Sequence, residues 1–337
     1  MRIAGMTAVL VTLAVTPAFA QHELLVGNKS ADTVWRLSLD DGRRLGEVAS
    51  GEGPHEIAVS PNGDIALVTD YGRREAGNSL TVVELANSRA QAGIDLGDHR
   101  RPHGARFLAD GRRALVTSEH SGKLLVVDVA ARQVERAIEV GAGTAHMVAL
   151  SRDGAMAYVS KIAAGTVSRI DLDRGEKTHE RPAGTGAEGI EVAADGTVWV
   201  TNRADDTVTV HDPDTLAVRH TLASEGFPIR IVFTADDRHA LVTNARAATL
   251  AVFDAASRER VATVPLAPEG AQYKQTLLGR DALPIGVIAD PCRPRAYVAI
   301  SGADLVAVID TQAWTVVDHW QTGREPDALA LSGRSCG

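Results

Sequence analysis

Three histidines and one glutamate recur at one place in a repeated pattern of the sequence. His55, His103, His146 and Glu188 each stand at the start of a short apolar segment in consecutive repeats. Neutral imidazole and carboxylate suit Zn, Mn, Fe or Cu, and three or four such ligands leave a position for water or substrate. A water bound to such a metal could attack an ester or lactone, or the metal could polarise a carbonyl for proton abstraction.

Two other interpretations of the same four residues remain open. Without a metal they would form a polar pocket for a small ligand, in which one His or Glu could act as a general base. They would otherwise line a structural, water-filled channel. The sequence contains no His-Glu-x-x-His motif and no phosphate-binding loop, and it predicts no nucleophilic triad.

The pattern that carries these residues runs through the chain. It reads approximately Gly-x-x-Pro-His-x-Ile-x-Val-Ser-x-Asp-Gly, followed by a second apolar segment. We call the residue after the proline, or its equivalent, the leading residue; the seven are His55, His103, His146, Glu188, Ile229, Ile285 and Asp327. Repeats of about 40 to 45 residues built from short strands are typical of a β-propeller. Seven leading residues therefore predict seven blades.

Turn residues support four strands in each repeat. An Asn-Gly or Asp-Gly pair, as at Asn62-Gly63 and Asp153-Gly154, predicts a tight hairpin between the first and second strands. Each third strand ends on an acid that we expect to cap the following turn; these acids are Glu84, Asp128, Asp171, Asp212, Asp254 and Asp310.

The last repeat is split between the two ends of the chain. Pro326–Ser332 supplies one strand, and the other three are expected at Glu23–Asn28, 34–39 and Arg44–Ala49. The prediction is an all-β, seven-bladed propeller of residues 21–337, closed by pairing of the C-terminal strand with N-terminal strands. Such closure leaves only short strand edges.

The leading residues should share one face of the ring with the loops between second and third strands. These loops add polar side chains as candidates for substrate binding, together with Arg230 beside the leading residues: Asp70, Glu119, His120, Lys161, Asn202, Arg203, Asn244 and Arg246. Asn28 and Lys29 take the same place in the split blade. Both irregularities of the repeat, residues 71–78 and the insertion 267–283 with Tyr273 and Lys274, also fall on this face. Insertions in repeat proteins gather on the functional face, so we expect a ligand to enter there, under the second insertion.

The first twenty residues differ from the rest. Arg2 precedes an apolar run over residues 3–15, and Ala18-Phe19-Ala20 has the form of a cleavage site. Residues 1–20 are therefore predicted to be a secretory signal peptide, which implies export to a periplasm. No other segment reaches transmembrane length. The net charge of −8, without a basic stripe, disfavours binding to nucleic acid.

The sequence contains two cysteines, Cys292 and Cys336. Aligned on their blades, both fall in the first hairpin turn of adjacent blades. In an oxidising compartment we expect them to form a disulfide that pins the C-terminal strand, the alternative being two free thiols.

The strands Val200-Thr201-Asn202 and Leu241-Val242-Thr243-Asn244 resemble those of the YVTN-repeat β-propeller family, over about residues 23–332. The resemblance implies a periplasmic propeller related to surface-layer proteins, proteins of unclear role and lactonase-like enzymes. We therefore expect an exported propeller that binds a small polar ligand, either as a hydrolase, lyase or isomerase assisted by a divalent metal, or as a non-catalytic propeller for a ligand or a periplasmic protein partner.

Overall fold

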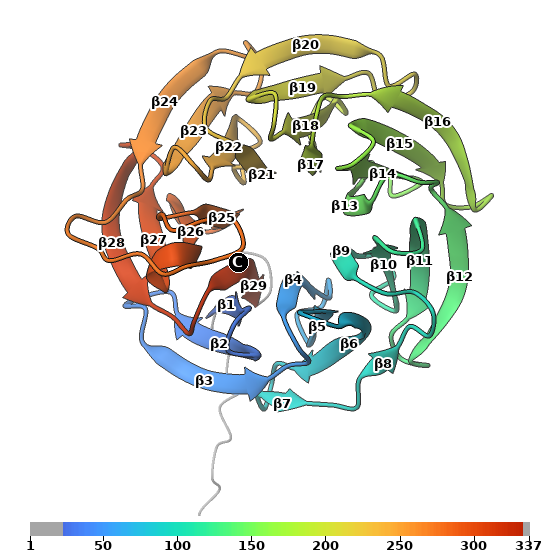
Figure 1. Ribbon diagram of the computed structural model, residues 1–337, viewed down its shortest axis with the longest axis horizontal. Coiled ribbons are helices and arrows are strands. Elements are labelled where there is room, and N and C mark those ends of the chain that lie inside the picture. The colour runs from blue at the N-terminus through green and yellow to red at the C-terminus, as the bar shows by residue number, and fades with distance from the viewer. Residues whose placement is uncertain (1–22, 333–337) are drawn as a thin grey trace, which may run out of the picture.

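The computed structural model describes residues 23–332, which form seven small sheets around a central axis (Figure 1). The first strands in chain order are β1 (Glu23–Asn28), β2 (Thr33–Ser38), β3 (Arg44–Ala49), β4 (Pro54–Val59), β5 (Ile65–Gly72), β6 (Ala76–Glu84), β7 (Arg89–Ala90), β8 (Ile94–Asp95), β9 (Pro102–Phe107), β10 (Arg113–Ser118), β11 (Lys123–Asp128), β12 (Gln133–Glu139), β13 (Ala145–Leu150), β14 (Met156–Lys161), β15 (Thr166–Asp171) and β16 (Glu176–Pro182).

The remaining strands continue the same order. They are β17 (Ala187–Val192), β18 (Val198–Asn202), β19 (Thr207–His211), β20 (Val218–Ala223), β21 (Pro228–Phe233), β22 (His239–Asn244), β23 (Thr249–Asp254), β24 (Arg260–Pro265), β25 (Pro284–Ala289), β26 (Arg295–Ile300), β27 (Leu305–Asp310), β28 (Thr315–Gln321) and β29 (Pro326–Ser332). The 3-10 helix η1 (Ser301–Ala303) lies between β26 and β27, and no helix in residues 23–332 is long and apolar enough to cross a membrane.

The seven predicted blades are confirmed. Five blades are antiparallel four-stranded sheets that follow chain order, from β9–β12 to β25–β28, and the blade of β4–β7 gains β8 as a further partner of β6. The predicted closure is also confirmed, because β29 pairs with β1 in the order β29-β1-β2-β3. In that pairing Glu23 faces Ser332 and Val26 faces Leu329.

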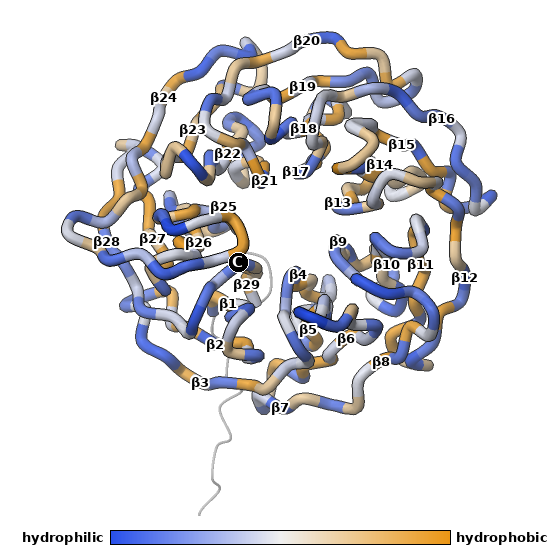
Figure 2. The backbone as a smooth tube through the Cα atoms, in the orientation of Figure 1, coloured by the Kyte–Doolittle hydropathy of each residue, from blue (hydrophilic) through white to orange (hydrophobic). Residues whose placement is uncertain are grey.

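Two local features explain why the repeat folds in this way. The five aspartates at the ends of third strands cap their turns as predicted. Asp254 Oδ1, for example, accepts hydrogen bonds from the backbone amides of Ala256 and Ser257, at 3.0 and 2.8 Å. Glu84 instead accepts a hydrogen bond from the side-chain amide of Asn87 at 2.9 Å. Hydrophobic and hydrophilic positions alternate along the strands (Figure 2). The middle strands of each blade therefore bury Val, Leu, Ile and Ala between blades, while outer strands such as β16 remain largely accessible to solvent.

A hydroxyl on the second strand of the blade fixes the leading position. Thr117 Oγ1 accepts a hydrogen bond from the amide of Gly104 at 2.8 Å and donates to the carbonyl of His146 in the next blade. The innermost strands are bulged at the same place, for example between Ala145 and Val148 of β13. A bulge re-aims side chains, and here it turns the leading residues toward the axis.

Only one of the two cysteines of the predicted disulfide lies within the described residues. Cys292 lies in the turn between β25 and β26, as expected, and its amide donates to Asp290 Oδ1 at 2.9 Å. Cys336 and the signal peptide of residues 1–20 lie outside the described residues. The disulfide and the cleavage site therefore stay predictions.

Candidate functional site

The three leading histidines form one stack at the mouth of the central channel. Ring centroids are 4.2 Å apart for His55 and His103, and 3.6 Å apart for His103 and His146. Their strands, β4, β9 and β13, are the innermost strands of three consecutive blades. His103 is 1% exposed and His146 is 6% exposed, so the stack is largely closed to bulk water.

The stacked imidazoles differ in charge. Burial lowers the pKa of His103 well below its ordinary value, and the neighbouring His146 and His55 act in the same direction. Burial also opposes charge on His146, but its hydrogen bonds to Glu119 and Glu188 outweigh this and raise its pKa. His146 Nδ1 lies 2.6 Å from Glu119 Oε1, and Nε2 lies 3.5 Å from Glu188 Oε1. A neutral imidazole therefore lies directly against an imidazolium.

The third histidine, His55, belongs to a separate charge group. Its Nδ1 lies 3.2 Å from Asp327 Oδ2, and its Nε2 lies 3.2 Å from the ammonium of Lys29. Lys29 also donates to Asp327 at 3.1 Å. Burial would raise the pKa of Asp327, but the charges of His55 and Lys29 hold it well below its usual range.

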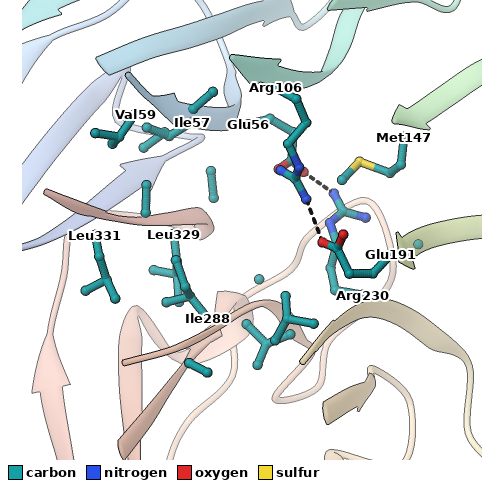
Figure 3. A pocket seen from close by; sticks show the side chains of 18 of the residues that line it. Glu56, Ile57, Val59, Arg106, Met147, Glu191, Arg230, Ile288, Leu329 and Leu331 are labelled. Carbon is teal, nitrogen blue, oxygen red and sulfur yellow. Dashed lines mark hydrogen bonds and ion pairs between the residues drawn. The ribbon is translucent and has the colours of Figure 1, made fainter. Parts of the chain in front are cut away.

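The glutamate at the fourth leading position is held by two guanidinium groups. Arg203 Nη1 donates to Glu188 Oε2 at 2.8 Å, and Arg230 Nη1 approaches Oε1 at 3.4 Å. Arg230 also reaches across the channel, where its Nη2 donates to Glu56 Oε1 at 2.5 Å (Figure 3). Burial would raise the pKa of Glu188, but its partners, His146 first, lower it. Glu188 is therefore a fixed anion.

Glycines on either side of Arg230 make this crossing possible. The residue after the leading one is Gly189 in the preceding blade and Gly286 in the following blade. A Cβ atom at Gly189 would collide with the carbonyl oxygen of Ile229, and one at Gly286 would collide with that of Asp327. Because neighbouring inner strands approach so closely, the ring has room at this level for only a few long side chains, such as Arg230 and Glu56.

Residues 33–261 match the family described as the seven-bladed β-propeller lactonases. The match spans well over half of the chain. The chain belongs to this lactonase family.

Two solved structures share the fold of this lactonase-family propeller. One is hydrazine synthase from Kuenenia stuttgartiensis, at 19% identity and a TM-score of 0.69, with 82% of this chain and 88% of that chain covered. The other is a functionally unknown protein from Desulfotomaculum acetoxidans, at 14% identity and a TM-score of 0.77, with 93% of this chain and 99% of that chain covered. A search of curated proteins found no match. At these identities the likeness shows the fold alone.

The first predicted irregularity of this lactonase-family chain, residues 71–78, places Tyr71 at the site. The extra residues lengthen the β5–β6 hairpin, in which Gly72 pairs with Ala76. This extension holds Tyr71 over the stack, with its ring centroid 4.8 Å from that of His55. The Tyr71 hydroxyl donates to Glu119 Oε2 at 2.5 Å, so Glu119 is oriented from both sides by Tyr71 and His146. Burial, followed by the charge of Glu119, raises the pKa of Tyr71 and keeps it protonated.

The second irregularity lies on the same face, as predicted. Lys274 contacts Asp304 through its ammonium group and Gly302 through its amide, which attaches the insertion to the loop between β26 and β27. Tyr273 packs against the hydrophobic core of the last two intact blades. Leu278 packs against a hydrophobic cluster that contains Ile229 and Ile285, the two apolar leading residues. The insertion therefore lies on the apolar side of the ring.

Of the predicted substrate-binding residues, Glu119 contacts the histidine stack directly, and Arg203 and Arg230 contact Glu188 beside it. Lys161, Asn202 and Asn244 end their second strands, and Asp70 lies near the end of β5. All four are buried inside blades, where each bonds nearby backbone or side-chain groups. Asn202, for example, donates to Thr207 and Thr209 of its own blade, both at 3.2 Å. His120 and Arg246 are exposed, and the Arg246 guanidinium lies 4.1 Å from the ring centroid of Phe227.

We call the histidine stack, the charged or polar side chains in contact with it or with Glu188, and Glu56 the cluster. Two of its members were not predicted as site residues. Glu56 follows the leading histidine of its repeat, and no recurring pattern marks this position, because the other repeats carry Gly104, Met147, Gly189, Arg230, Gly286 and Ala328 there. Tyr71 opens the first irregularity, which was the available signal, but its place beside Glu119 depends on the lengthened hairpin.

Two groups of residues could hold a metal ion. The donor atoms of His55, Glu56 and His103 lie within 4.8 Å of one another, and so do those of His103, Glu119 and His146. His103 is common to both, and neither of its buried ring nitrogens has a partner within residues 23–332. Glu56 and Glu119, however, are already bonded to Arg230 and His146. Glu188, the fourth predicted ligand, is in neither group.

The carboxylates of the cluster have cationic partners without a metal. Those of Glu56, Glu119, Glu188 and Asp327 contact Arg230, His146, Arg203 and Lys29, respectively. Buried charges are tolerated when they are paired in this way. Among the described residues of the cluster, His103 is the histidine whose two ring nitrogens both lack a partner; in its neutral form it offers one ring nitrogen as a donor and the other as an acceptor.

Proposed function

We propose that this protein hydrolyses a small lactone or ester that carries a carboxylate, at the cluster around His103. The observation that carries the proposal is the contact between His103, held neutral, and His146, held protonated. Two adjacent titratable groups whose surroundings push their pKa values apart are suited to act as base and acid. Membership of the lactonase family supports the same reaction class.

The two histidines would divide the proton transfers. As water attacks the acyl carbon, His103 takes the proton of that water through its free ring nitrogen. The bond between the acyl carbon and the ring oxygen then breaks, and the leaving oxygen takes the Nε2 proton of His146, which is only loosely held at 3.5 Å from Glu188. The product is a hydroxy acid. Transfer of the proton from His103 to His146 restores the starting state.

The other members of the cluster position these groups and the substrate. Glu119, fixed by Tyr71, orients His146 and stabilises its charge. Arg203 and Lys29 have side chains that are 29% and 17% exposed, more than most of the cluster, so they are the cations that an incoming carboxylate meets first. An arginine can bind a carboxylate through two parallel hydrogen bonds.

Activity measurements with matched variants test the proposal. Release of acid from a panel of γ- and δ-lactones, with and without a carboxylate substituent, would be followed in a pH-stat. We expect turnover by the wild type, a loss of about 100-fold or more in His103→Gln and His146→Gln, and no change in His120→Gln, an exposed histidine on the same face. Because the pKa of His146 is raised above its ordinary value and the acid must be protonated, the rate should persist through the ordinary histidine range near about pH 6.5 and fall only at higher pH. A wild type that hydrolyses none of the panel would overturn the proposal in favour of a non-catalytic binding protein.

A divalent cation at His103 is a second candidate, favoured by the two donor groups that share this residue. His103 would hold it together either with His55 and Glu56 or with Glu119 and His146, and it would supply Lewis-acid activation of water or of the carbonyl. Elemental analysis of protein purified without a histidine tag separates the two. Stoichiometric Zn, Mn, Fe or Cu that is lost in His103→Ala would support the metal, whereas turnover by metal-free protein would exclude a requirement for it.

We further propose that the protein acts after export, since residues 1–20 have the composition of a secretory signal. Mass spectrometry of protein from the native periplasm should find Gln21 at the N-terminus. An intact Met1 would contradict export by cleavage.

A further inference from the structure

The central channel contains a cavity that begins at the bridge between Glu56 and Arg230. Its volume is about 520 Å³, and it extends along the inner strands to Pro61 and Pro291 in the turns of the opposite face. Small-molecule sites commonly have volumes of roughly 300–1,000 Å³. The cavity contacts the cluster at Glu56 and Arg230, whereas none of its lining residues belongs to the histidine stack.

The wall of this cavity is mostly apolar. Ile57, Val59, Ile288, Leu329 and Leu331 come from three blades that are adjacent around the ring (Figure 3). A channel that served only to hold water would not need such a surface, because apolar groups gain free energy on leaving water. Concave apolar surfaces with a few convergent polar groups are typical of ligand sites.

One side of the cavity carries the ion pair of Arg106 and Glu191, in which N–H donors outnumber the available acceptors. Arg106 Nη2 donates to Glu191 Oε2 at 3.1 Å, and its Nη1 makes a long contact of 3.4 Å to the carbonyl of Ala105. Within residues 23–332, Arg106 Nε donates to no protein acceptor. Glu191, in contrast, has both oxygens in use, since Oε1 accepts from the amide of Val192 at 3.1 Å. The pair therefore lacks an acceptor rather than a donor.

We propose that this channel is a binding site for an apolar molecule that ends in a carboxylate, such as a medium-chain or alicyclic acid. The hydrocarbon part lies against Ile57, Ile288 and Leu329, and the carboxylate bonds Arg106 in competition with Glu191. The site is separate from the proposed hydrolytic centre, because none of its lining residues belongs to the histidine stack. Its ligand is bound without being converted.

Calorimetric titration of the intact protein with octanoate, and with octanol as the uncharged comparison, tests the site. The wild type should bind octanoate more tightly than octanol. Arg106→Gln should weaken octanoate binding by about tenfold or more and leave octanol binding unchanged, because it removes a charge-assisted hydrogen bond. Glu191→Gln should strengthen octanoate binding severalfold, because it removes the competing carboxylate.

The opposite signs of these two effects distinguish a ligand site from a structural ion pair. If both variants weaken binding alike, or if the wild type binds neither compound or both equally, the proposal is wrong. Ile288→Trp should abolish binding of both compounds by filling the channel, with Ile288→Leu as its matched control. Thermal unfolding of each variant verifies that it is folded, and lactone turnover by the same samples reports separately on the hydrolytic centre.

Discussion

The ring of leading residues consists of two arcs that use one backbone design for different purposes. The polar arc runs from Asp327 through the three histidines to Glu188, and the apolar arc consists of Ile229 and Ile285. Both arcs receive the same hydroxyl bond from the preceding blade: Thr117 donates to the carbonyl of His146, and Thr243 donates to that of Ile285 at 2.8 Å. The backbone is thus fixed without regard to the leading side chain, which leaves that side chain available for chemistry.

The arcs differ in what stabilises them. Ile229 and Ile285 bury apolar surface with Phe227 and Leu283, which is favourable in itself. The polar arc removes charges from water and is tolerated only because each charge has a partner. Changes in the polar arc should therefore have larger effects than changes of similar size in the apolar arc.

Arg230 offers the strongest test of this difference, since it follows Ile229 directly. Its side chain is 8% exposed and contacts Glu56 and Glu188. Arg230→Met should lower the free energy of unfolding by about 3–5 kcal/mol, because it leaves buried carboxylates without their cation. Ile229→Val, the neighbouring apolar change, should cost about 0.5–1.5 kcal/mol. Urea unfolding measures both.

A double variant sharpens the result. If the loss in Arg230→Met comes from stranded charge, adding Glu56→Gln should restore part of it, so that the double variant loses less than the two single variants together. Additive losses would mean that packing, rather than pairing, explains the role of Arg230.

Asp70 tests whether a charge inside a blade behaves like one in the polar arc. Burial raises the pKa of Asp70 to about 6, although Ser79 and Thr81 donate hydrogen bonds to it. A raised pKa in the folded state means that the stability contributed by the protonated form is complete below about pH 4 and is lost as the pH rises through about 6. Asn28, Asn202 and Asn244 occupy the equivalent position in other blades, so asparagine fits there.

Asp70→Asn should therefore stabilise the protein above pH 6, by up to about 3 kcal/mol, and should leave it unchanged or slightly less stable at pH 4. Unfolding in urea at several pH values measures this difference. A constant difference between variant and wild type at all pH values would show that Asp70 does not titrate in this range.

Most of the fold could be predicted from the sequence because its determinants are local and repeated. The Asp-Gly turns, the capping acids and the spacing of the leading residues each mark one hairpin, and together they gave seven blades and the closing strand. The polar arc was also predictable, since a shared position in the repeat places side chains at a shared radius.

What could not be predicted depends on side-chain direction and on single blades. Lys161 and Asn202 stand one residue before a loop, but their side chains turn inward because the last residue of a strand still follows the pleat. Glu56 meets Arg230 across the channel, 174 residues away in sequence. No spacing within a repeat encodes that meeting, because it depends on the diameter of the ring.

Leu278 gives the smallest expected effect and tests whether the insertion 267–283 is fastened to the apolar arc. It is partly buried against the hydrophobic cluster that contains Ile229 and Ile285, whereas the adjacent Leu277 is 89% exposed. Leu278→Ala should cost about 1 kcal/mol in the free energy of unfolding, less than truncation of a fully buried leucine. Leu277→Ala should change it by less than about 0.5 kcal/mol, because an exposed side chain loses little on truncation. Proteolysis of the insertion should become faster in Leu278→Ala alone, since the loop would open more often without its apolar anchor. Equal cleavage rates in both variants would show that Lys274 and its contacts, rather than the apolar arc, hold the insertion in place.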